Sequence, residues 1–324
     1  MIDPRLHTLR VLRDRGTVTA TAMALHLTPS TVSQQLRGLA KELDVELLEQ
    51  VGRRVRLTAA ARALLRHADL LAAQAELARA ELAGHRAGVA GVLRISAMPT
   101  ALAAVVVGAA AGLRDAHPDL TVELFEDESK HCFELLLAGD SDIAVVLPAP
   151  GSPALDDPRF EQRPLLDEPM DLLVPVGHSL AHRDSVALFE VAAEPWISGL
   201  ERITHHLVVT AACAAAGFTP RIAGRAVDFT GVAAMVAYGF GVSLVARMTL
   251  LPAELQVVRI PLHGSTAPSR RHLTVIRRGS AEHPVVAAGL TAIRQACARR
   301  TDITALQPDL LHNVVNSGGS GAIA

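Results

Sequence analysis

The sequence predicts a mainly α N-terminal unit with a helix–turn–helix and a β hairpin, a long linker helix, and an α/β domain of two subdomains. In residues 17–57, two helical patterns flank a turn and an arginine-rich hairpin follows. Over residues 59–84, apolar residues recur every three or four positions, which is the spacing of one helix face. From residue 92 onward, short apolar runs alternate with helical patterns, which is typical of a sheet covered by helices.

The N-terminal unit is expected to begin with a helix that ends at Gly16, because glycine is the usual residue after a helix end. Thr17 is a candidate cap for a second, short helix. The inner face of that helix is expected to hold Ala22, Met23 and either Leu25 or Leu27. Small alanines on this helix would let another helix approach closely.

A third helix is expected from Pro29 to about Leu43, since a threonine followed by proline is a strong helix start. Its apolar residues follow one another at spacings of four, three and four and so define one buried stripe. They are Val32, Leu36, Leu39 and Leu43. Short polar side chains near the N-terminus of this helix can approach base edges and phosphates without bulk. The candidate DNA-binding residues on it are Ser30, Thr31, Ser33, Gln34 and Arg37.

Helix spacing alone fits an ordinary surface helix, and the hairpin that follows favours DNA binding. Val55 and Leu57 form one face of this hairpin, arginines form the other face, and Gly52 supplies the turn. Arginines on one face suit the DNA backbone or the minor groove. The candidate residues are Arg53, Arg54 and Arg56.

The linker helix is expected to be capped by Thr58 and to end near Gly84. Its apolar residues at four–three spacing are Leu64, Ala68, Leu71, Ala75, Ala78 and Leu82. A helix packed on its own domain would show the same pattern. A single helix between two globular units, however, has little of its own domain to lie on.

The remaining chain predicts two α/β units. Strand–helix–strand–helix–strand patterns over residues 92–146 indicate a parallel unit, and residues 171–245 hold a second one. The strand pattern near residues 272–276 and a last helix near 284–299 run back to the first unit. Two crossovers, near residues 164–168 and 261–270, therefore join the two subdomains.

Composition excludes several classes of protein. Three widely spaced cysteines without a C-x-x-C pair argue against a disulfide framework and a cysteine-based zinc site, and fit a reducing cytoplasm. Arginines interrupt any apolar run near the N-terminus, so no signal peptide is expected. The alanine-rich run 101–111 is too short to cross a bilayer, and we expect no membrane partner.

The charge is unevenly placed. Residues 1–66 contain 11 basic and 6 acidic residues, a net charge of +5, whereas the rest contains 20 basic and 27 acidic residues, a net charge of −7. A basic head on an acidic body indicates a polyanion partner for the head. An ordinary solvated surface explains the charge equally well, so the charge alone does not decide.

Taken together, the first sixty residues resemble the winged helix–turn–helix of LysR-type transcriptional regulators. The resemblance rests on the Val32-Ser33 step, the leucines that follow, and the run Arg53-Arg54-Val55-Arg56-Leu57-Thr58. Looser phrases support it further along, such as AGFTP at residues 216–220 and VAYGFGV at residues 236–242. Asp44 replaces a common glycine, and aspartate tolerates the left-handed conformation that glycine would adopt. Gln50 stands where an arginine is common and is left out of the site.

The resemblance implies a regulator that binds double-stranded DNA and responds to a small-molecule effector. The linker helix would pair with its counterpart in a homodimer or homotetramer, and RNA polymerase would be a further partner. The C-terminal domain would resemble periplasmic binding proteins. The expected domains are residues 1–58 (winged helix–turn–helix), 59–88 (linker helix and hinge), 89–300 (regulatory, with subdomain I at 92–165 and 270–300 and subdomain II at 166–265) and 301–324 (a flexible tail).

An effector is expected in the cleft between the subdomains, where strand ends meet helix N-termini. Hydroxyl and free backbone N–H groups over residues 96–100 would suit an anionic effector, although plain helix capping explains them equally well. The candidate effector-binding residues are Ser96, Met98, Thr100, Val146, Ser198, Thr204, Asp228 and Thr230.

Two other classes of protein were weighed. A solute-binding protein is opposed by the basic head and by the lack of a signal peptide. An enzyme on an α/β scaffold is not excluded by fold alone, but no catalytic constellation stands out. His178 and His182 are four apart, yet they fall in a loop, and Gly239-Phe240-Gly241 lacks the third glycine of a dinucleotide fingerprint. We therefore expect neither a metal nor a cofactor.

Overall fold

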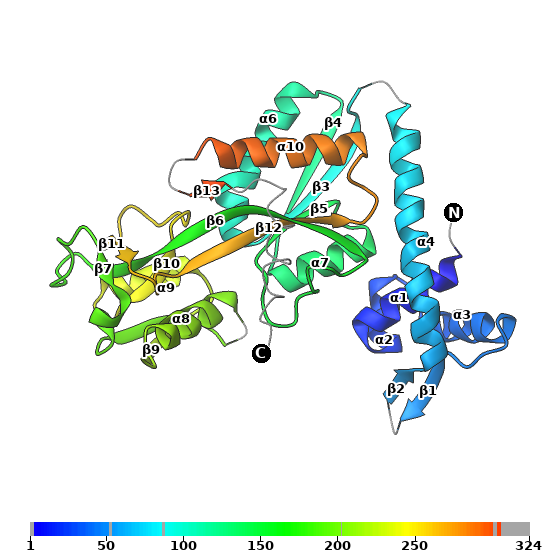
Figure 1. The fold of residues 1–324 in the computed structure, drawn as a ribbon, viewed down its shortest axis with the longest axis horizontal. Coiled ribbons are helices and arrows are strands. Elements are labelled where there is room, and N and C mark those ends of the chain that lie inside the picture. The colour runs from blue at the N-terminus through cyan, green and yellow to red at the C-terminus, as the bar shows by residue number, and fades with distance from the viewer. Residues whose placement is uncertain (1–2, 52–53, 86–87, 202, 301–302, 306–324) are drawn as a thin grey trace, which may run out of the picture.

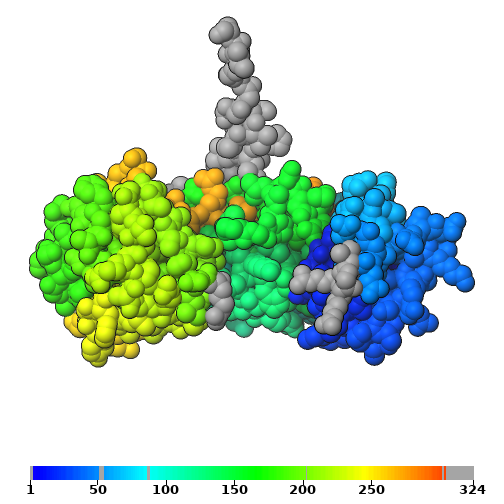
Figure 2. Space-filling model, turned by 90° about the horizontal axis from the view of Figure 1, so that it is seen from below, coloured from blue at the N-terminus to red at the C-terminus, as the bar shows by residue number. Residues whose placement is uncertain are grey.

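The computed structural model describes residues 3–51, 54–85, 88–201, 203–300 and 303–305. An N-terminal head lies at one end of the molecule, and helix α4 runs from the head along the edge of the α/β body (Figure 1). We call the part of that body next to the head subdomain I and the far part subdomain II. Figure 2 shows the same row of head, subdomain I and subdomain II from below.

The head consists of α1 (Pro4–Arg15), α2 (Val18–Ala24), α3 (Pro29–Glu42), β1 (Leu48–Val51) and β2 (Arg54–Leu57). The predicted helix starts after Thr17 and Thr28 and the predicted end of α1 at Gly16 are confirmed. The Oγ1 atom of Thr17 accepts a hydrogen bond from the N–H of Ala20, and Thr28 does the same for Thr31. Gly16 ends α1 in the left-handed conformation, at φ 73°. Asp44 also adopts this conformation, at φ 50°, as expected.

Two apolar residues expected in the core of the head are exposed. Val32, Leu36 and Leu39 are buried, but Leu43 is 44% exposed, because α3 ends one residue earlier and Leu43 is its C-cap. Met23 is 73% exposed. Thr21 and Ala22 fill the inner face of the short helix α2 instead.

Helix α4 (Ala59–Gly84) is capped by Thr58, as expected, and has two different faces. One face is buried against the head and subdomain I; it includes Ala61, Leu65, Ala68, Asp69, Ala75 and Ala80. Leu70, Leu71, Leu77 and Leu82 are exposed. The helix touches the regulatory domain at Gly279, where an added Cβ would collide with the carbonyl oxygen of Ala73. Gly279 has φ 90°, so the turn needs glycine for its conformation as well as for its closeness to α4.

Subdomain I is the parallel α/β unit that the sequence predicts. Strands β3 (Gly91–Ala97), β4 (Leu120–Glu126) and β5 (Ile143–Val146) lie in the order β4-β3-β5 and pair in parallel. The helices of this subdomain are α5 (Pro99–Ala101), η1 (Leu102–Val106), α6 (Val107–Ala116), α7 (Ser129–Ala138) and α10 (Pro284–Ala298).

Residues 99–116 form one continuous helical segment of 18 residues, with a π-helical turn over Leu102–Val106. Within the described residues, this is the one helix long and apolar enough to span a membrane, and it is longer than the alanine-rich run suggests. Its buried side chains, including Val105, Val106 and Leu113, belong to the core of subdomain I. The apolar character of the segment is therefore explained by packing on the sheet.

Two long antiparallel strands, β6 (Phe160–Pro175) and β12 (Ser269–Arg277), run from subdomain I into subdomain II (Figure 1). The second α/β unit was expected to begin with a strand at residue 171, but this residue lies near the end of β6. Its start was missed because Pro164 and Pro169 interrupt the strand pattern. Both crossovers are thus made of paired strands, with a register shift between His272 and Leu273.

Subdomain II is built on the far ends of these strands. Its elements are β7 (Val186–Ala187), η2 (Leu188–Val191), β8 (Pro195–Gly199), α8 (Thr204–Ala215), β9 (Arg221–Ala226), α9 (Phe229–Ala237), β10 (Ser243–Ala246) and β11 (Val257–His263). The strands β10 and β11 pair with β6, whereas β8 and β9 form a separate parallel pair. The short strand β13 (Thr304–Ala305) also pairs with β6. The fold class is the expected one.

Candidate DNA-binding surface and regulatory cleft

Hydroxyl groups gather at the N-terminus of α3. The Oγ1 atom of Thr28 lies 2.7 Å from the Oγ of Ser30 and 2.8 Å from the Oγ1 of Thr31. Ser30 and Gln34 are exposed, and Thr31 and Ser33 are half-buried. The N-terminus of a helix favours a negative partner, and here exposed or half-buried polar side chains surround it.

Helix α3 is held firmly against the rest of the head. Thr8 of α1 donates a hydrogen bond of 2.5 Å to the Oε1 of Gln35. Arg37 is exposed and its Nε donates to the carbonyl of Ser33, at 3.2 Å, one turn earlier on the helix. The outer face of α3 therefore presents a fixed row of polar groups to a partner.

The predicted hairpin is present, and its strands pair in antiparallel register with Val51 opposite Arg54. Arg56 is 69% exposed, and its Nε donates a 2.7 Å hydrogen bond to the Oε1 of Glu49 on the neighbouring strand. Gly52 and Arg53 lie outside the described residues. A groove of about 800 Å³ separates the hairpin from α3, and Arg37 and Lys41 are among its lining residues.

Three of the predicted effector residues lie inside subdomain I. The Oγ of Ser96 is buried and lies 3.0 Å from the Oγ of Ser141. Met98 and Val146 belong to apolar cores. The N–H of Met98 donates to the carbonyl of Val145, so the expectation of a free N–H group is wrong at this position. The structure does not bring these three side chains to the cleft.

Thr100 and Thr204 mark the two sides of the subdomain junction. Thr100 accepts a 3.0 Å hydrogen bond from the Nη2 of Arg270 on the crossover strand β12. Thr204, at the start of α8, donates a 3.0 Å hydrogen bond to the Oε2 of Glu128 in subdomain I. The second contact joins the two subdomains directly.

The other residues predicted in subdomain II have local roles. The Oγ of Ser198 is buried and lies 3.1 Å from the Nδ1 of His206. Asp228 caps α9 by accepting from the N–H of Gly231. Thr230 is exposed.

Sequence reasoning missed a charged cluster buried in the crossover strands. The Oε2 of Glu168 accepts from the Nη2 of Arg270 at 2.5 Å and from the Nε2 of His272 at 2.8 Å. Its Oε1 accepts from the N–H of Met248 in subdomain II, at 2.7 Å. Through Thr100 and Met248, this cluster contacts both subdomains. The available signal was a glutamate and an arginine in the two predicted crossovers, followed by a histidine at the start of the next predicted strand.

Charge sets the protonation of this cluster. Burial alone would raise the pKa of Glu168, but the charge of Arg270 and the hydrogen bond from His272 outweigh it and lower that pKa to about 2. Burial lowers the pKa of His272, so its ring is neutral. Since the Nε2 of His272 donates to a carboxylate, its Nδ1 carries no proton, and that buried atom has no partner in the described structure. The Nε of Arg270 is buried and unpartnered in the same way.

His205 stands beside this cluster at the start of α8. Its Nε2 donates to the carbonyl of Leu244 at 2.9 Å, and its ring packs on Phe229 with centroids 4.7 Å apart. Burial lowers the pKa of His205 to about 4, and the charge of Arg270 acts in the same direction. The ring is therefore neutral near pH 7.

Two family models match the chain. The model described as bacterial regulatory helix-turn-helix protein, lysR family, matches residues 4–62, and the model described as LysR substrate binding domain matches residues 86–298. HTH-type transcriptional regulator ShiR of Corynebacterium glutamicum (strain R) is 30% identical over 276 residues, which are 80% of this chain and 85% of ShiR.

Further comparisons agree on the family and the fold. A probable hydrogen peroxide-inducible genes activator of Mycobacterium avium is 30% identical over 263 residues, covering 80% of this chain and 82% of that protein. Full-length OxyR from Pseudomonas aeruginosa, solved as a single-residue variant, has a similar fold, with a TM-score of 0.64 at 19% identity. That comparison covers 95% of this chain and 98% of the other. The chain belongs to the LysR family of bacterial transcriptional regulators.

Proposed function

We propose that Ser30, Thr31, Ser33, Gln34 and Arg37 contact bases and phosphates in the major groove, and that Arg53, Arg54 and Arg56 hold the DNA backbone or the minor groove. The proposal is supported by the polar N-terminal end of α3, where the hydroxyls of Ser30 and Thr31 lie within 2.8 Å of the hydroxyl of Thr28. A helix presented in this way, beside an arginine-bearing hairpin, suits a recognition helix in the major groove. The site of action would be the cytoplasm, where the DNA lies.

The test is binding of the purified protein to the DNA immediately upstream of its own gene, with salt and non-specific competitor titrated. We expect binding that resists competitor, with a footprint over two half-sites about 34 Å apart. Binding that disappears with competitor would mean that the head recognises this DNA only as a polyanion. The absence of binding at low salt would contradict the proposal.

For the effector, we infer a site at the subdomain junction formed by Thr100 and Thr204, with Ser198, Asp228 and Thr230 around it. The buried Nε of Arg270 offers a hydrogen-bond donor that no described group satisfies. A ligand that enters between Thr204 and Glu128 would break their hydrogen bond. If the ligand binds one relative orientation of the two subdomains more tightly than another, it shifts the population towards that orientation.

A peroxide-sensing role, suggested by the names of some relatives, has less support. Cys132, Cys213 and Cys297 are all buried, and burial raises the pKa of each thiol to about 12. The thiolate is the reactive form of cysteine, so these thiols are poor targets for an oxidant. A reversibly bound effector is therefore the better explanation for control.

For assembly, we propose that α4 pairs with the α4 of a second copy. Leu70, Leu71 and Leu82 are exposed on this helix, at 58%, 51% and 64%. An exposed apolar row on a long helix favours helix pairing. Light scattering of the Leu71→Glu, Leu82→Glu double variant tests this proposal, because it should lower the mass relative to the parent protein. The number of subunits and any contact with RNA polymerase are further points for experiment.

A further inference from the structure

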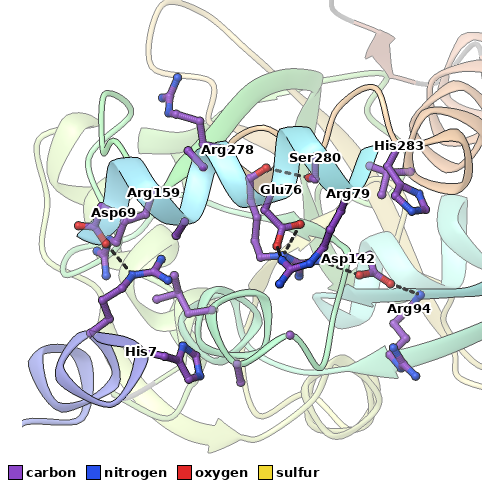
Figure 3. Close-up of a pocket in the computed structure, with 18 of the residues that line it drawn as sticks. His7, Asp69, Glu76, Arg79, Arg94, Asp142, Arg159, Arg278, Ser280 and His283 are labelled. Carbon is purple, nitrogen blue, oxygen red and sulfur yellow. Dashed lines mark hydrogen bonds and ion pairs between the residues drawn. The ribbon is translucent and has the colours of Figure 1, made fainter. Parts of the chain in front are cut away.

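A cavity of about 570 Å³ lies where the head, the linker helix α4 and subdomain I meet (Figure 3). The side chains of α4 form one wall, α1 of the head contributes His7 and Arg10, and subdomain I forms the other side. The volume falls in the range of small-molecule sites. None of the residues assigned to DNA or to the cleft lines this cavity.

Arginine dominates the wall of this cavity. Its lining arginines are Arg10, Arg79, Arg94, Arg159, Arg277 and Arg278. Its lining carboxylates are Asp69, Glu76 and Asp142. The lining arginines thus outnumber the lining carboxylates.

Each lining carboxylate is shared between two donors. Asp69 accepts from the Nε of Arg10 at 2.8 Å and from the Nη1 of Arg13, behind the wall, at 2.6 Å. Glu76 pairs with Arg79, and it also lies 3.5 Å from the Nε of Arg277.

Asp142 is engaged in the same manner. It accepts from the Nη2 of Arg277 at 2.9 Å and from the backbone N–H of Arg94 at 3.0 Å. The side chains of Arg94 and Arg159 reach carboxylates outside the wall. The lining carboxylates, and the carboxylates that Arg94 and Arg159 reach, are therefore all paired with arginines.

Arg278 is the lining arginine for which the described residues supply no carboxylate partner. Its Nε donates to the carbonyl of Pro158 at 2.9 Å, and its Nη2 donates to the carbonyl of Phe160 at 2.8 Å. Among the described residues it forms no ion pair. These contacts hold the guanidinium against the segment before β6, beside the cavity wall, without neutralising its charge.

The N-terminus of α10 borders the same cavity. His283 occupies the N-cap position, but its side chain makes no capping hydrogen bond, and its buried Nδ1 has no partner in the described structure. Val285 and Val286, in the first turn, line the cavity. The first N–H groups of a helix have no partner within the helix, and they favour an anion.

We propose that this cavity binds a small metabolite that carries a carboxylate or phosphate group, with Arg278, Arg79 and the N-terminus of α10 as the anion-binding groups. The site is separate from the subdomain junction. Because its walls come from the head, the linker helix and subdomain I, the bound anion stabilises one orientation of the head on the regulatory domain. The chain then has two ligand-binding sites, and a ligand bound at this one acts directly on the head.

The test measures thermal unfolding of the full-length protein with inorganic phosphate or citrate, against sodium chloride at equal ionic strength. We expect phosphate, citrate or both to raise the Tm relative to chloride, according to whether the site binds phosphate or carboxylate groups. In Arg79→Gln and Arg278→Gln, that increase should fall to less than about half, since ligand stabilisation follows affinity. Arg66→Gln is the matched control, because Arg66 is an exposed arginine on the same helix that does not line the cavity.

An equal increase in all variants would place the anion elsewhere, for example on the DNA-binding arginines, and would overturn the proposal. No increase over chloride with either oxyanion would overturn it too. If Arg278→Gln fails to fold, Arg79→Gln decides, because Arg79 is 54% exposed and its single described ion pair is local to α4. DNA binding of each variant is measured separately, so failure of this site and failure of the proposed DNA binding remain distinguishable.

Discussion

Arg159 donates a 2.6 Å hydrogen bond from its Nη1 to the Oδ1 of Asp14, which joins the segment before β6 to the end of helix α1. These residues are 145 positions apart, and both are less than one-fifth exposed. The neighbouring Arg15 pairs with Glu134 of α7. The DNA-binding head is thus attached to subdomain I by side-chain contacts, in addition to the linker helix.

The first prediction concerns this attachment. In the Asp14→Asn, Glu134→Gln double variant both pairs lose their charge, while the core of each unit stays intact. We expect the free energy of unfolding to change by no more than about 1 kcal/mol, because partly exposed ion pairs contribute little. The head should move more freely, so amide exchange at the junction of α1 with α7 should become faster.

The matched control is Asp44→Asn, which removes an exposed charge from the head at a place without a described contact to subdomain I. In this control variant, amide exchange at the junction of α1 with α7 should be unchanged. If the double variant also exchanges like the parent protein, the ion pairs do not hold the head in place.

The second prediction separates sequence reading from phosphate binding. Arg54→Ala should weaken binding to every DNA sequence and reduce the salt slope by about 1, because the side chain is proposed to meet a phosphate. Gln34→Ala should change the preferred sequence instead, at a cost of about 1–3 kcal/mol at one position, since an amide can bind an adenine edge. Binding titrations on the footprinted site and on scrambled DNA measure both. Equal, sequence-independent losses in both variants would contradict these roles.

Local signals made the head predictable from sequence. Caps at Thr17, Thr28 and Thr58 and the glycine at Gly16 fix the helix ends through neighbours in the chain. The alternation of helix and strand patterns also depends on residues close together in the chain, and it predicted the α/β body. Met23 and Leu43 were misplaced because periodicity says nothing about where a short helix stops or which neighbour fills its inner face.

The regulatory site was only partly predictable. A polar residue at a strand end was expected in the cleft, but Ser96 lies 3.0 Å from Ser141 inside subdomain I. The sequence cannot tell which side of a sheet such a residue faces. The pairing of Glu168 with Arg270 joins residues 102 positions apart, and no local pattern reports a contact of that kind.

The third prediction concerns the thiols. Because Cys132, Cys213 and Cys297 are buried and their pKa values are raised to about 12, hydrogen peroxide at micromolar concentration should leave all three reduced in the folded protein. DNA binding should be the same before and after treatment. Mass spectrometry after alkylation of free thiols measures whether the three cysteines stay reduced. The urea-unfolded protein is the control in which the thiols are accessible. Oxidation of one thiol in the folded protein, together with altered DNA binding, would revive the peroxide-sensing explanation.

The fourth prediction is a pH dependence that comes from His205. Its pKa is lowered from 6.5 to about 4 in the folded protein, so only the unfolded chain takes up a proton between these values. The stabilisation from the neutral ring is fully present above pH 6.5 and is lost as the pH falls towards 4. The full loss is about 3 kcal/mol, from the size of the pKa shift.

His205→Gln should remove most of this dependence, because the glutamine amide is neutral throughout and can still donate to the carbonyl of Leu244. Urea unfolding at intervals between pH 7 and 5 measures it, in a range where Glu168, with a pKa of about 2, stays ionised in the folded protein. The control is His67→Gln, an exposed histidine on α4. We expect the control to keep the slope of the parent protein. If His205→Gln keeps it as well, the ring of His205 is not held neutral by its burial at the start of α8.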